Sequence, residues 1–431
     1  MKNYLTFVIL IAVIFSGSGF AGGTETKPYT SSKTVSLNGL YFAGADGIIK
    51  SFSNPAGLIY LNESGIEFSV SDRLAQSEFD NPSRGLFKSF KEDEFNFNGG
   101  FLWNISDRIN AAVSYQQVVD YNVSWPYANY FQHDSLSALL VFDFYNNLNV
   151  DAISVSFAYK LDNFAFGITP VIYQITNKIS FPQNNPLWTS GVGTAAYQFE
   201  YDLEAWTFGL NVGMIAELST DLKIALSARS AYSADLEGEA KSRMFFVTDS
   251  TDEVTELKSG FEMPWTLGFG MVYSLSTNFN FNFDLQYSLW SNIQSDINYT
   301  FSNPIWQSSL NETDMGSGIK GRNFILSFNN TIDVGLGIEF ISQSNISYRA
   351  GYRFSQSPNS EETYNMLFPI VDQHVFSVGA GLRDGNLVFD AVLLYALGIQ
   401  RDVRNDIIPN LHGSYNYDLI IPMVTLKYLL F

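Results

Sequence analysis

Three arginines are the residues best suited to bind an anionic group. Arg349 and Arg353 alternate with apolar neighbours from Tyr348 to Phe354, and Arg229 follows Leu226 and Ala228 in the same rhythm. Because side chains alternate between the faces of a strand, all three fall on the polar face. A guanidinium there can hold a carboxylate through two parallel hydrogen bonds. We expect these arginines to bind a ligand in the interior that this face lines, which is the lumen of the barrel predicted below. Alternatively, they form ion pairs with carboxylates of the same face, Asp284, Asp333 and Glu339.

Catalytic and metal chemistry find little support. Of the three histidines, His133 begins a His133-Asp134-Ser135 sequence, but adjacent residues cannot assemble a nucleophile, a base and its orienting acid. The chain has no cysteine, which excludes thiolate metal sites. Acidic runs such as Glu92–Glu94 lack the spacing of a calcium loop. We therefore expect no catalytic residue, metal or cofactor, and no enzyme.

Aromatic residues gather in a long polar stretch between residues 122 and 150. Amphipathic rings attract lipid-like molecules, so these side chains could form an external capture groove; alternatively they pack the loop itself. The candidates for ligand capture are Trp125, Tyr127, Tyr130 and Phe131.

The elements that must position these residues are strands with a strict period of two. From Phe279 to Leu289 every odd residue is apolar, and Asn, Asp, Gln or Ser lies at each even position. The same alternation recurs at 206–214, 222–227 and 332–340. Such strands bury one face in lipid and the other in a polar interior, although a soluble sandwich also alternates. After residue 21 no apolar run reaches the roughly 18 residues of a membrane helix.

Connections between the strands alternate between short and long. Tight turns fall at 161–163, 219–221, 276–278, 342–345 and 384–386, and long polar connections lie between them, including 355–372. Short periplasmic turns and long external loops are typical of outer-membrane barrels. We predict an all-β protein, a transmembrane antiparallel β-barrel of about fourteen strands over residues 65–431. In its last strand, the parity that exposes Val424 and Tyr428 turns Lys427 inward.

The amino-terminal region reads as two further segments. Residues 1–21 have a basic start, an apolar run and small residues ending at Ala21, as in a secretory signal peptide. Residues 22–64 lack alternation and are expected to form an element separate from the barrel wall. The net charge of −19 has the wrong sign for nucleic acid.

The second segment ends in Asn54-Pro55-Ala56-Gly57-Leu58, which resembles the hatch, or plug, motif of the FadL/TodX (OMPP1) family of hydrophobic-compound transporters. Trp206–Gly213, Pro264–Gly268 and Tyr348–Tyr352 resemble central strands of that family in order and spacing. The resemblance covers most of the mature chain and is weakest in its first third and in the loops.

The resemblance implies a fourteen-stranded barrel of the bacterial outer membrane, blocked by an N-terminal hatch at 22–64. It also implies uptake of fatty acids or other hydrophobic molecules by loop capture, lumen binding and hatch gating, with sideways exit near a kink in the third strand. The third candidate strand, 110–121, contains neither Pro nor Gly, so no kink is expected there; Pro170 and Pro264 are the visible candidates for a break.

The expected partners of the chain are a hydrophobic ligand and outer-membrane lipid, and we expect the chain to act as a monomer. The main alternative is a FadL-like barrel that docks secreted proteins or has a structural role without small-molecule transport. A transporter should contain a closed apolar pocket beside an inward arginine, whereas a docking barrel could be filled with polar side chains. A general porin would need an open aqueous lumen.

Overall fold

The computed structural model describes residues 30–44, 47–83, 85–126, 143–184, 196–244, 253–293, 296–304, 319–320, 323–404 and 412–430. Within these ranges no helix has the length and apolar character needed to cross a membrane. Residues 1–21, the predicted signal peptide, lie outside them.

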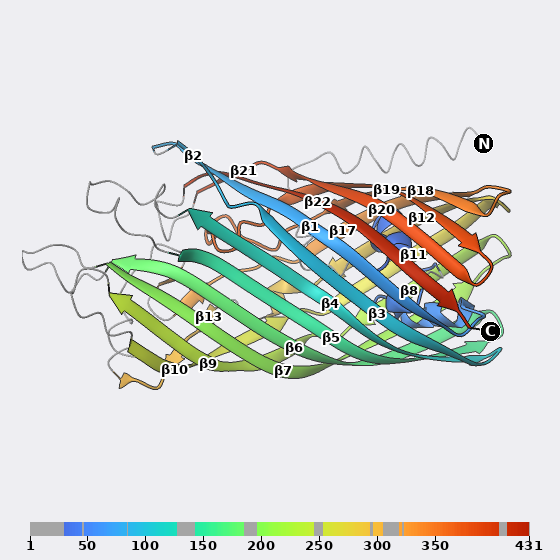
Figure 1. Ribbon diagram of the computed structural model, residues 1–431, viewed down its shortest axis with the longest axis horizontal. Helices are drawn as coiled ribbons and strands as arrows, with labels where there is room; N and C mark the ends of the chain where they lie inside the picture. The colour runs from blue at the N-terminus through green and yellow to red at the C-terminus, as the bar shows by residue number, and fades with distance from the viewer. Residues whose placement is uncertain are drawn as a thin grey trace, which may run out of the picture.

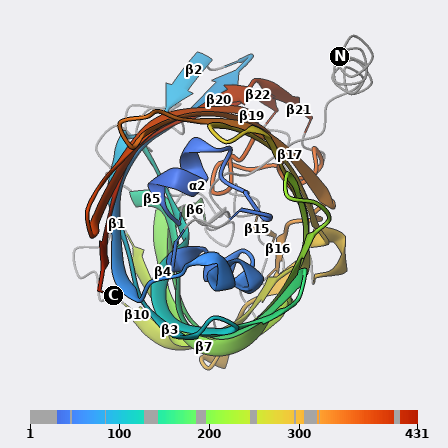
Figure 2. The same cartoon turned by 90° about the vertical axis from the view of Figure 1, so that its right-hand side faces the viewer.

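Long antiparallel strands form a closed barrel of fourteen spanning strands (Figures 1 and 2). Closure is made by the ladder between the first and last strands, from Gly65 opposite Leu429 to Asp80 opposite Ser414. Three spanning strands consist of two consecutive segments, β8 with β9, β10 with β11, and β12 with β14. The principal strands are β1 (Gly65–Asn81), β3 (Glu92–Ser106), β4 (Ile109–Pro126), β5 (Asp143–Leu161), β6 (Phe164–Asn184), β7 (Ala196–Glu217), β8 (Leu222–Arg229), β9 (Tyr232–Met244), β10 (Glu253–Met263), β11 (Thr266–Ser276), β12 (Phe279–Ser288), β17 (Thr331–Ile341), β18 (Ile346–Ser355), β19 (Asp372–Asp384), β20 (Leu387–Ile399) and β22 (Gly413–Leu429).

Short elements extend the barrel on the side of the long loops. They are β2 (Gly85–Lys88), β13 (Asp296–Asn298), β14 (Thr300–Phe301), β15 (Ile319–Lys320), β16 (Asn323–Ile325), β21 (Arg401–Val403) and the 3-10 turn η6 (Trp290–Asn292). β13, β15 and β16 form a separate small sheet.

The predicted faces are confirmed by exposure. In β22 the outward Val424 and Tyr428 are 45% and 50% exposed, whereas Lys427 is 9% exposed and lies 4.0 Å from Glu67 inside the barrel. In β12 the polar residues Asn282 and Asp284 are buried on the inner side. A charged side chain on the lipid-facing side would cost free energy in the bilayer, so the apolar side chains of each strand face the lipid. The alternation therefore determines which side chains reach the lumen.

The predicted tight turns are also confirmed. Strands end and resume around 161–163, 219–221, 276–278, 342–345 and 384–386. Asp162, Asn345 and Gly385 take positive φ values of 50°, 59° and 56° there, and Asn, Asp and Gly tolerate that conformation in short hairpin turns. The connection at 355–372 differs from the prediction. Residues 356–371 pass over the lumen, and Tyr364, Met366 and Leu367 are fully buried.

The third spanning strand, β4, is irregular, contrary to the expectation from its composition. Its ladder to β5 shifts by one residue between Gln117 and Val119, so that Val118 is an extra, bulged residue. Its ladder to β3 ends at Tyr115 opposite Gly99. A β-bulge needs only one inserted residue and no Pro or Gly, which is why the absence of those residues did not exclude it.

The described residues of the segment before β1 lie inside the barrel (Figure 2). They form a short helix α2 (Ser32–Ser36) and two 3-10 helices, η2 (Ile49–Phe52) and η3 (Pro55–Tyr60). We call residues 30–44 and 47–61 the inner segment. It contacts strands on opposite sides of the wall, α2 against β18 to β22 and η3 against β4 to β7.

Candidate functional site: the lumen and its apolar pocket

The Asn54–Leu58 motif builds a tight element within the inner segment. The Asn54 side chain accepts from the Ala56 amide at 3.1 Å, so it caps η3, and it donates to the Phe42 carbonyl at 3.0 Å. Pro55 occupies the first turn of η3, where its missing amide hydrogen and fixed φ suit a helix start. Ala56, Gly57 and Leu58 are buried. The motif therefore makes a compact corner whose polar groups are satisfied internally.

Glycines in the barrel wall allow the inner segment to approach closely. A Cβ built at Gly213 would lie 1.9 Å from the Asn54 amide oxygen, and one at Gly167 would lie 2.3 Å from the Ala56 nitrogen. Similar contacts occur at Gly268, Gly270, Gly335, Gly351 and Gly379, which face Phe42, Ala43, Asn38, Leu37 and Ser36. These inward glycines are a sequence signal that could have located the contact surface.

Arg353 and Asp284 hold the inner segment by charge-assisted hydrogen bonds. Arg353 is fully buried and donates to the Asn38 carbonyl at 3.1 Å. Asp284 accepts from the Asn38 side chain at 3.1 Å and from the Phe42 amide at 2.7 Å. Both charged groups thus bind backbone or side chain of the inner segment.

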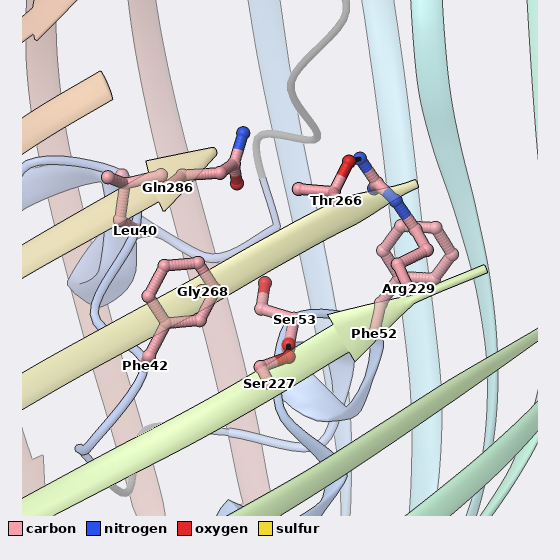
Figure 3. A pocket seen from close by; sticks show the side chains of 10 residues that line it. Leu40, Phe42, Phe52, Ser53, Ser227, Arg229, Thr266, Gly268 and Gln286 are labelled. Carbon is pink, nitrogen blue, oxygen red and sulfur yellow. Dashed lines mark hydrogen bonds between the residues drawn. The ribbon is translucent and has the colours of Figure 1, made fainter. Parts of the chain in front are cut away.

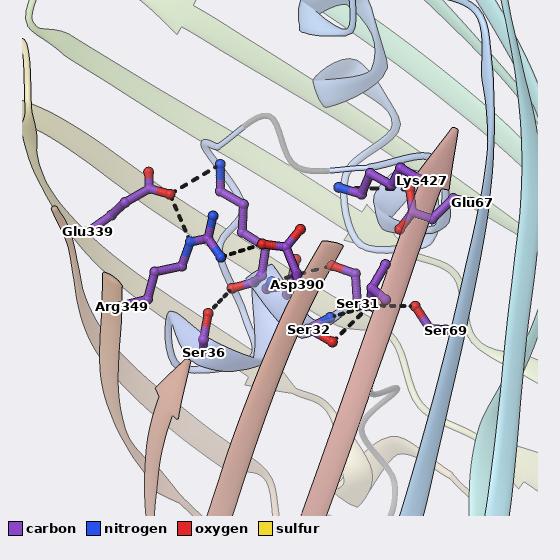
Figure 4. A network of polar contacts seen from close by, with 12 residues as sticks. Ser31, Ser32, Ser36, Glu67, Ser69, Glu339, Arg349, Asp390 and Lys427 are labelled. Atoms are coloured by element: carbon purple, nitrogen blue, oxygen red, sulfur yellow. Dashed lines mark hydrogen bonds and ion pairs between the residues drawn. The ribbon is translucent and has the colours of Figure 1, made fainter. Parts of the chain in front are cut away.

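Arg349 lies in an ion network, as Figure 4 shows. Its Nε donates to Glu339 at 2.8 Å and its Nη1 donates to Asp390 at 2.6 Å. Lys33 of α2 adds a second cation 3.5 Å from Glu339. The alternation of side chains predicted that Arg349 and Glu339 lie on one face, and in the structure they form an ion pair. For Arg349 this agrees with the alternative prediction, in which the inward arginines pair with inward carboxylates.

Arg229 borders a small cavity between the wall and the inner segment (Figure 3). Its guanidinium stacks over Phe52 at 5.3 Å and donates to the Thr266 hydroxyl at 3.3 Å. The cavity has a volume of about 30 Å³, which is the space of a water molecule or two. Arg229, one of the three predicted arginines, therefore lines a cavity of the lumen.

A larger, mainly apolar pocket of about 300 Å³ lies in the outer half of the lumen, within the range of small-molecule sites. Its polar side chains include two amides, Asn177 and Asn298, and two carboxylates, Asp235 and Glu262. No arginine, lysine or histidine is among the described residues that line it. Its apolar lining consists of Val119, Tyr121, Leu148, Gly260, Phe261, Met263, Trp290, Ile293, Ile297, Leu326, Phe328, Pro358, Phe368 and Ile370.

The buried loop 356–371 covers this pocket from outside. Trp125 donates to the Met366 carbonyl at 2.8 Å, and Tyr121 donates to the Leu367 carbonyl at 3.1 Å. Tyr121 also stacks on Phe368 with ring centroids 5.5 Å apart. Trp125, predicted as a capture residue, is thus 2% exposed and packs the loop. Tyr127, Tyr130 and Phe131 lie outside the described residues.

Sequence reasoning missed most of this pocket because its residues come from eight separate regions of the chain. Val119 and Tyr121 point inward only because the bulge at Val118 reverses the parity of β4. Phe368 and Ile370 lie in a connection that composition alone assigned to solvent.

These features define a class of protein: a closed outer-membrane β-barrel whose lumen holds its own N-terminal segment beneath a covered apolar pocket. A family model described as outer membrane protein transport protein (OMPP1/FadL/TodX) matches residues 13–414. The chain belongs to this family. No match was found among curated protein sequences.

Solved structures share the fold at low sequence identity. The Pseudomonas putida toluene transporter TodX is 14% identical, with a TM-score of 0.75 over 94% of this chain and 99% of the other. A Pseudomonas aeruginosa FadL homologue is 13% identical, with a TM-score of 0.73 over 95% and 99%. The Ralstonia pickettii toluene transporter TbuX is 14% identical, with a TM-score of 0.66 over 95% and 100%.

Proposed function

We propose that this protein is a passive outer-membrane uptake channel for a hydrophobic small molecule, which binds in the apolar pocket. The observation that carries the proposal is the pocket itself: a covered cavity of about 300 Å³ lined chiefly by apolar and aromatic side chains. Family membership supports the same function. A general porin would need an aqueous lumen, and the inner segment occupies part of it.

The charges of the side chains that line the apolar pocket indicate which class of ligand it binds. A fatty acid carboxylate in the pocket would meet Asp235 and Glu262 and no cation among the described lining residues, and a buried anion needs a compensating partner. The lining therefore favours an uncharged compound over a long-chain fatty acid. Toluene, named in the titles of two similar structures, is a suitable probe. Arg229 remains the candidate for a carboxylate, at the small cavity.

The inner segment is proposed to act as the hatch. It is held on several sides by buried polar contacts from Asp284, Arg353 and Asn211 of the wall, which makes direct passage to the periplasm dependent on breaking them. The sequence-derived hypothesis is gating by displacement of this hatch. A second route out of the pocket would leave the hatch in place.

Uptake of labelled toluene and labelled oleate in cells lacking other channels of this family tests the proposal. We expect the wild-type protein to raise toluene uptake severalfold and more than oleate uptake. Leu148→Trp fills the pocket and should remove most of that increase, whereas Leu86→Trp, at an exposed position, should not. Arg229→Gln should leave toluene uptake unchanged. Uptake no higher than in cells without the protein would overturn the proposal.

A further inference from the structure

Asn177 of β6 is a buried polar side chain without a structural partner. It is 7% exposed, and its Oδ1 accepts no hydrogen bond from any described residue. By contrast, the inward amides of Asn146 and Asn211 donate to the carbonyls of Leu367 and Phe52. A buried polar atom without a partner destabilises the folded protein. Asn177 therefore needs an explanation other than the stability of the barrel.

The neighbours of Asn177 explain why it has no partner in the wall. On the adjacent strands it lies opposite Leu148 and Leu203. Along β6 the next side chains on the same face are Ile175 and Ile179, because side chains alternate along a strand. All four neighbours are buried apolar residues. Asn177 is thus a polar position within an apolar surface, where a leucine would leave no hydrogen bond unmade.

Asn177 is one of the residues that line the apolar pocket. The strands β4, β5 and β6 lie side by side in the wall (Figure 1), and their ladders place Tyr121 opposite Leu148 and Leu148 opposite Asn177. All three side chains line the pocket. A molecule bound there therefore lies against the surface that contains the unpartnered amide.

The other polar side chains at the pocket differ from Asn177. Glu262 and Asn298 interact with other groups of the protein, and Asp235 is exposed. The Tyr121 hydroxyl already donates to a carbonyl of loop 356–371, at 3.1 Å. Among the described lining residues, Asn177 is thus the buried group whose hydrogen-bonding capacity is unmet. A ligand in the pocket is the partner available to it.

The aromatic side chains of the pocket favour a ligand with an aromatic ring. Tyr121 stacks on Phe368 with ring centroids 5.5 Å apart, and Trp290 meets Phe328 edge to face at 5.3 Å. Aromatic rings prefer these offset and edge-to-face contacts, which a further ring can extend. A cavity of about 150 Å³ holds benzene. The pocket, at about 300 Å³, therefore has room for one ring and its substituents.

We infer that the pocket binds an aromatic compound that carries a hydroxyl group, a phenol, and that the Asn177 amide bonds to this hydroxyl. An acceptor without a donor requires a ligand that donates, and a hydroxyl can also accept, so it suits either end of an amide. A phenol is neutral at pH 7, so the carboxylates of the pocket do not repel it. This inference rests on the proposed function, and it names the class of ligand and the residue that selects it.

Three labelled probes with the same ring test the inference on wild-type protein: toluene, p-cresol and 4-methylanisole. Methylating the hydroxyl of p-cresol gives 4-methylanisole, which is more apolar but has no hydrogen to donate. Equilibrium dialysis against purified protein, with protein-free micelles as the blank, measures the three affinities. We expect p-cresol to bind about tenfold more tightly than 4-methylanisole, which is the value of about one hydrogen bond. Equal affinities for these two probes would overturn the inference.

Asn177→Leu separates ligand recognition from a structural role. We expect its affinity for p-cresol to fall about tenfold and its affinity for toluene to change less than about twofold. Without ligand it should unfold at a higher urea concentration than wild type, because an unpartnered polar group has been removed. Asn211→Leu is the matched control. The Asn211 amide donates to the Phe52 carbonyl of the inner segment at 2.9 Å, so this variant should unfold at a lower urea concentration and keep the wild-type ratio of p-cresol to toluene affinity.

The outcomes distinguish this inference from the proposed function. An unchanged ratio of p-cresol to toluene affinity in Asn177→Leu, or unfolding of that variant at a lower urea concentration than wild type, would overturn the role of Asn177. Wild-type protein that binds none of the three probes would instead overturn the proposed function.

Discussion

Arg349 illustrates how a residue chosen for ligand chemistry can be fully occupied by structure. It is 8% exposed and bonded to Glu339 and Asp390. Removing one member of a buried ion network leaves the remaining charges uncompensated, at a cost of about 3–5 kcal/mol. Parity predicted its direction correctly, but parity cannot tell a ligand from a neighbouring carboxylate.

We therefore expect Arg349→Met to lower the free energy of unfolding by about 3 kcal/mol or more, measured by urea titration in lipid vesicles, with toluene uptake retained in folded protein. Arg383→Met is the matched control because Arg383 and Glu63 form an exposed pair, and such pairs contribute about 0–1 kcal/mol. Equal losses in the two variants, or lost uptake with unchanged stability in Arg349→Met, would contradict the structural role.

At the scale of the element, one extra residue in β4 determines the outer lumen. The bulge at Val118 turns Val119, Tyr121 and Trp125 inward, where Tyr121 and Trp125 hold loop 356–371 over the pocket. Since side chains alternate along a strand, a one-residue change reverses every later side chain.

Deleting Val118 should reverse this part of β4, release loop 356–371 and abolish toluene binding. Limited proteolysis of the loop and equilibrium binding to purified protein measure the two effects. Val118→Ala keeps the residue count and should retain both the covered loop and the binding. A deletion variant that still binds toluene with a protected loop would show that the bulge does not position the lining.

At the scale of the whole molecule, the lipid-facing band fixes the barrel in the membrane. Val424 is 45% exposed on that band. A lysine on the lipid face costs about 2–4 kcal/mol near the bilayer midplane, whereas Lys427, three residues on, is tolerated inside beside Glu67.

Val424→Lys should therefore lower the free energy of unfolding in lipid vesicles by about 2 kcal/mol. Leu86→Lys, at an exposed position on β2 beyond the long strands, should change it by less than about 0.5 kcal/mol. A smaller loss for Val424→Lys than for Leu86→Lys would mean that the outer face of β22 is not in contact with lipid.

The sequence by itself determined the barrel, its turns and the direction of each strand's side chains, because these depend on a local period of two and on turn residues. It also located Asn54–Leu58, since the family motif is contiguous. It named Pro170 and Pro264 as candidate breaks; Pro264 lies between β10 and β11, whereas Pro170 lies within the continuous strand β6. The arginines were placed on the correct face for the same reason.

Only the tertiary structure decided what those side chains meet. The pairing of Arg349 with Glu339 and Asp390, the burial of loop 356–371 and the apolar pocket all depend on contacts between distant segments, which no local pattern contains. The bulge at Val118 likewise depends on how β4 and β5 share a ladder. A break in register belongs to a pair of strands, and a sequence shows only one strand at a time.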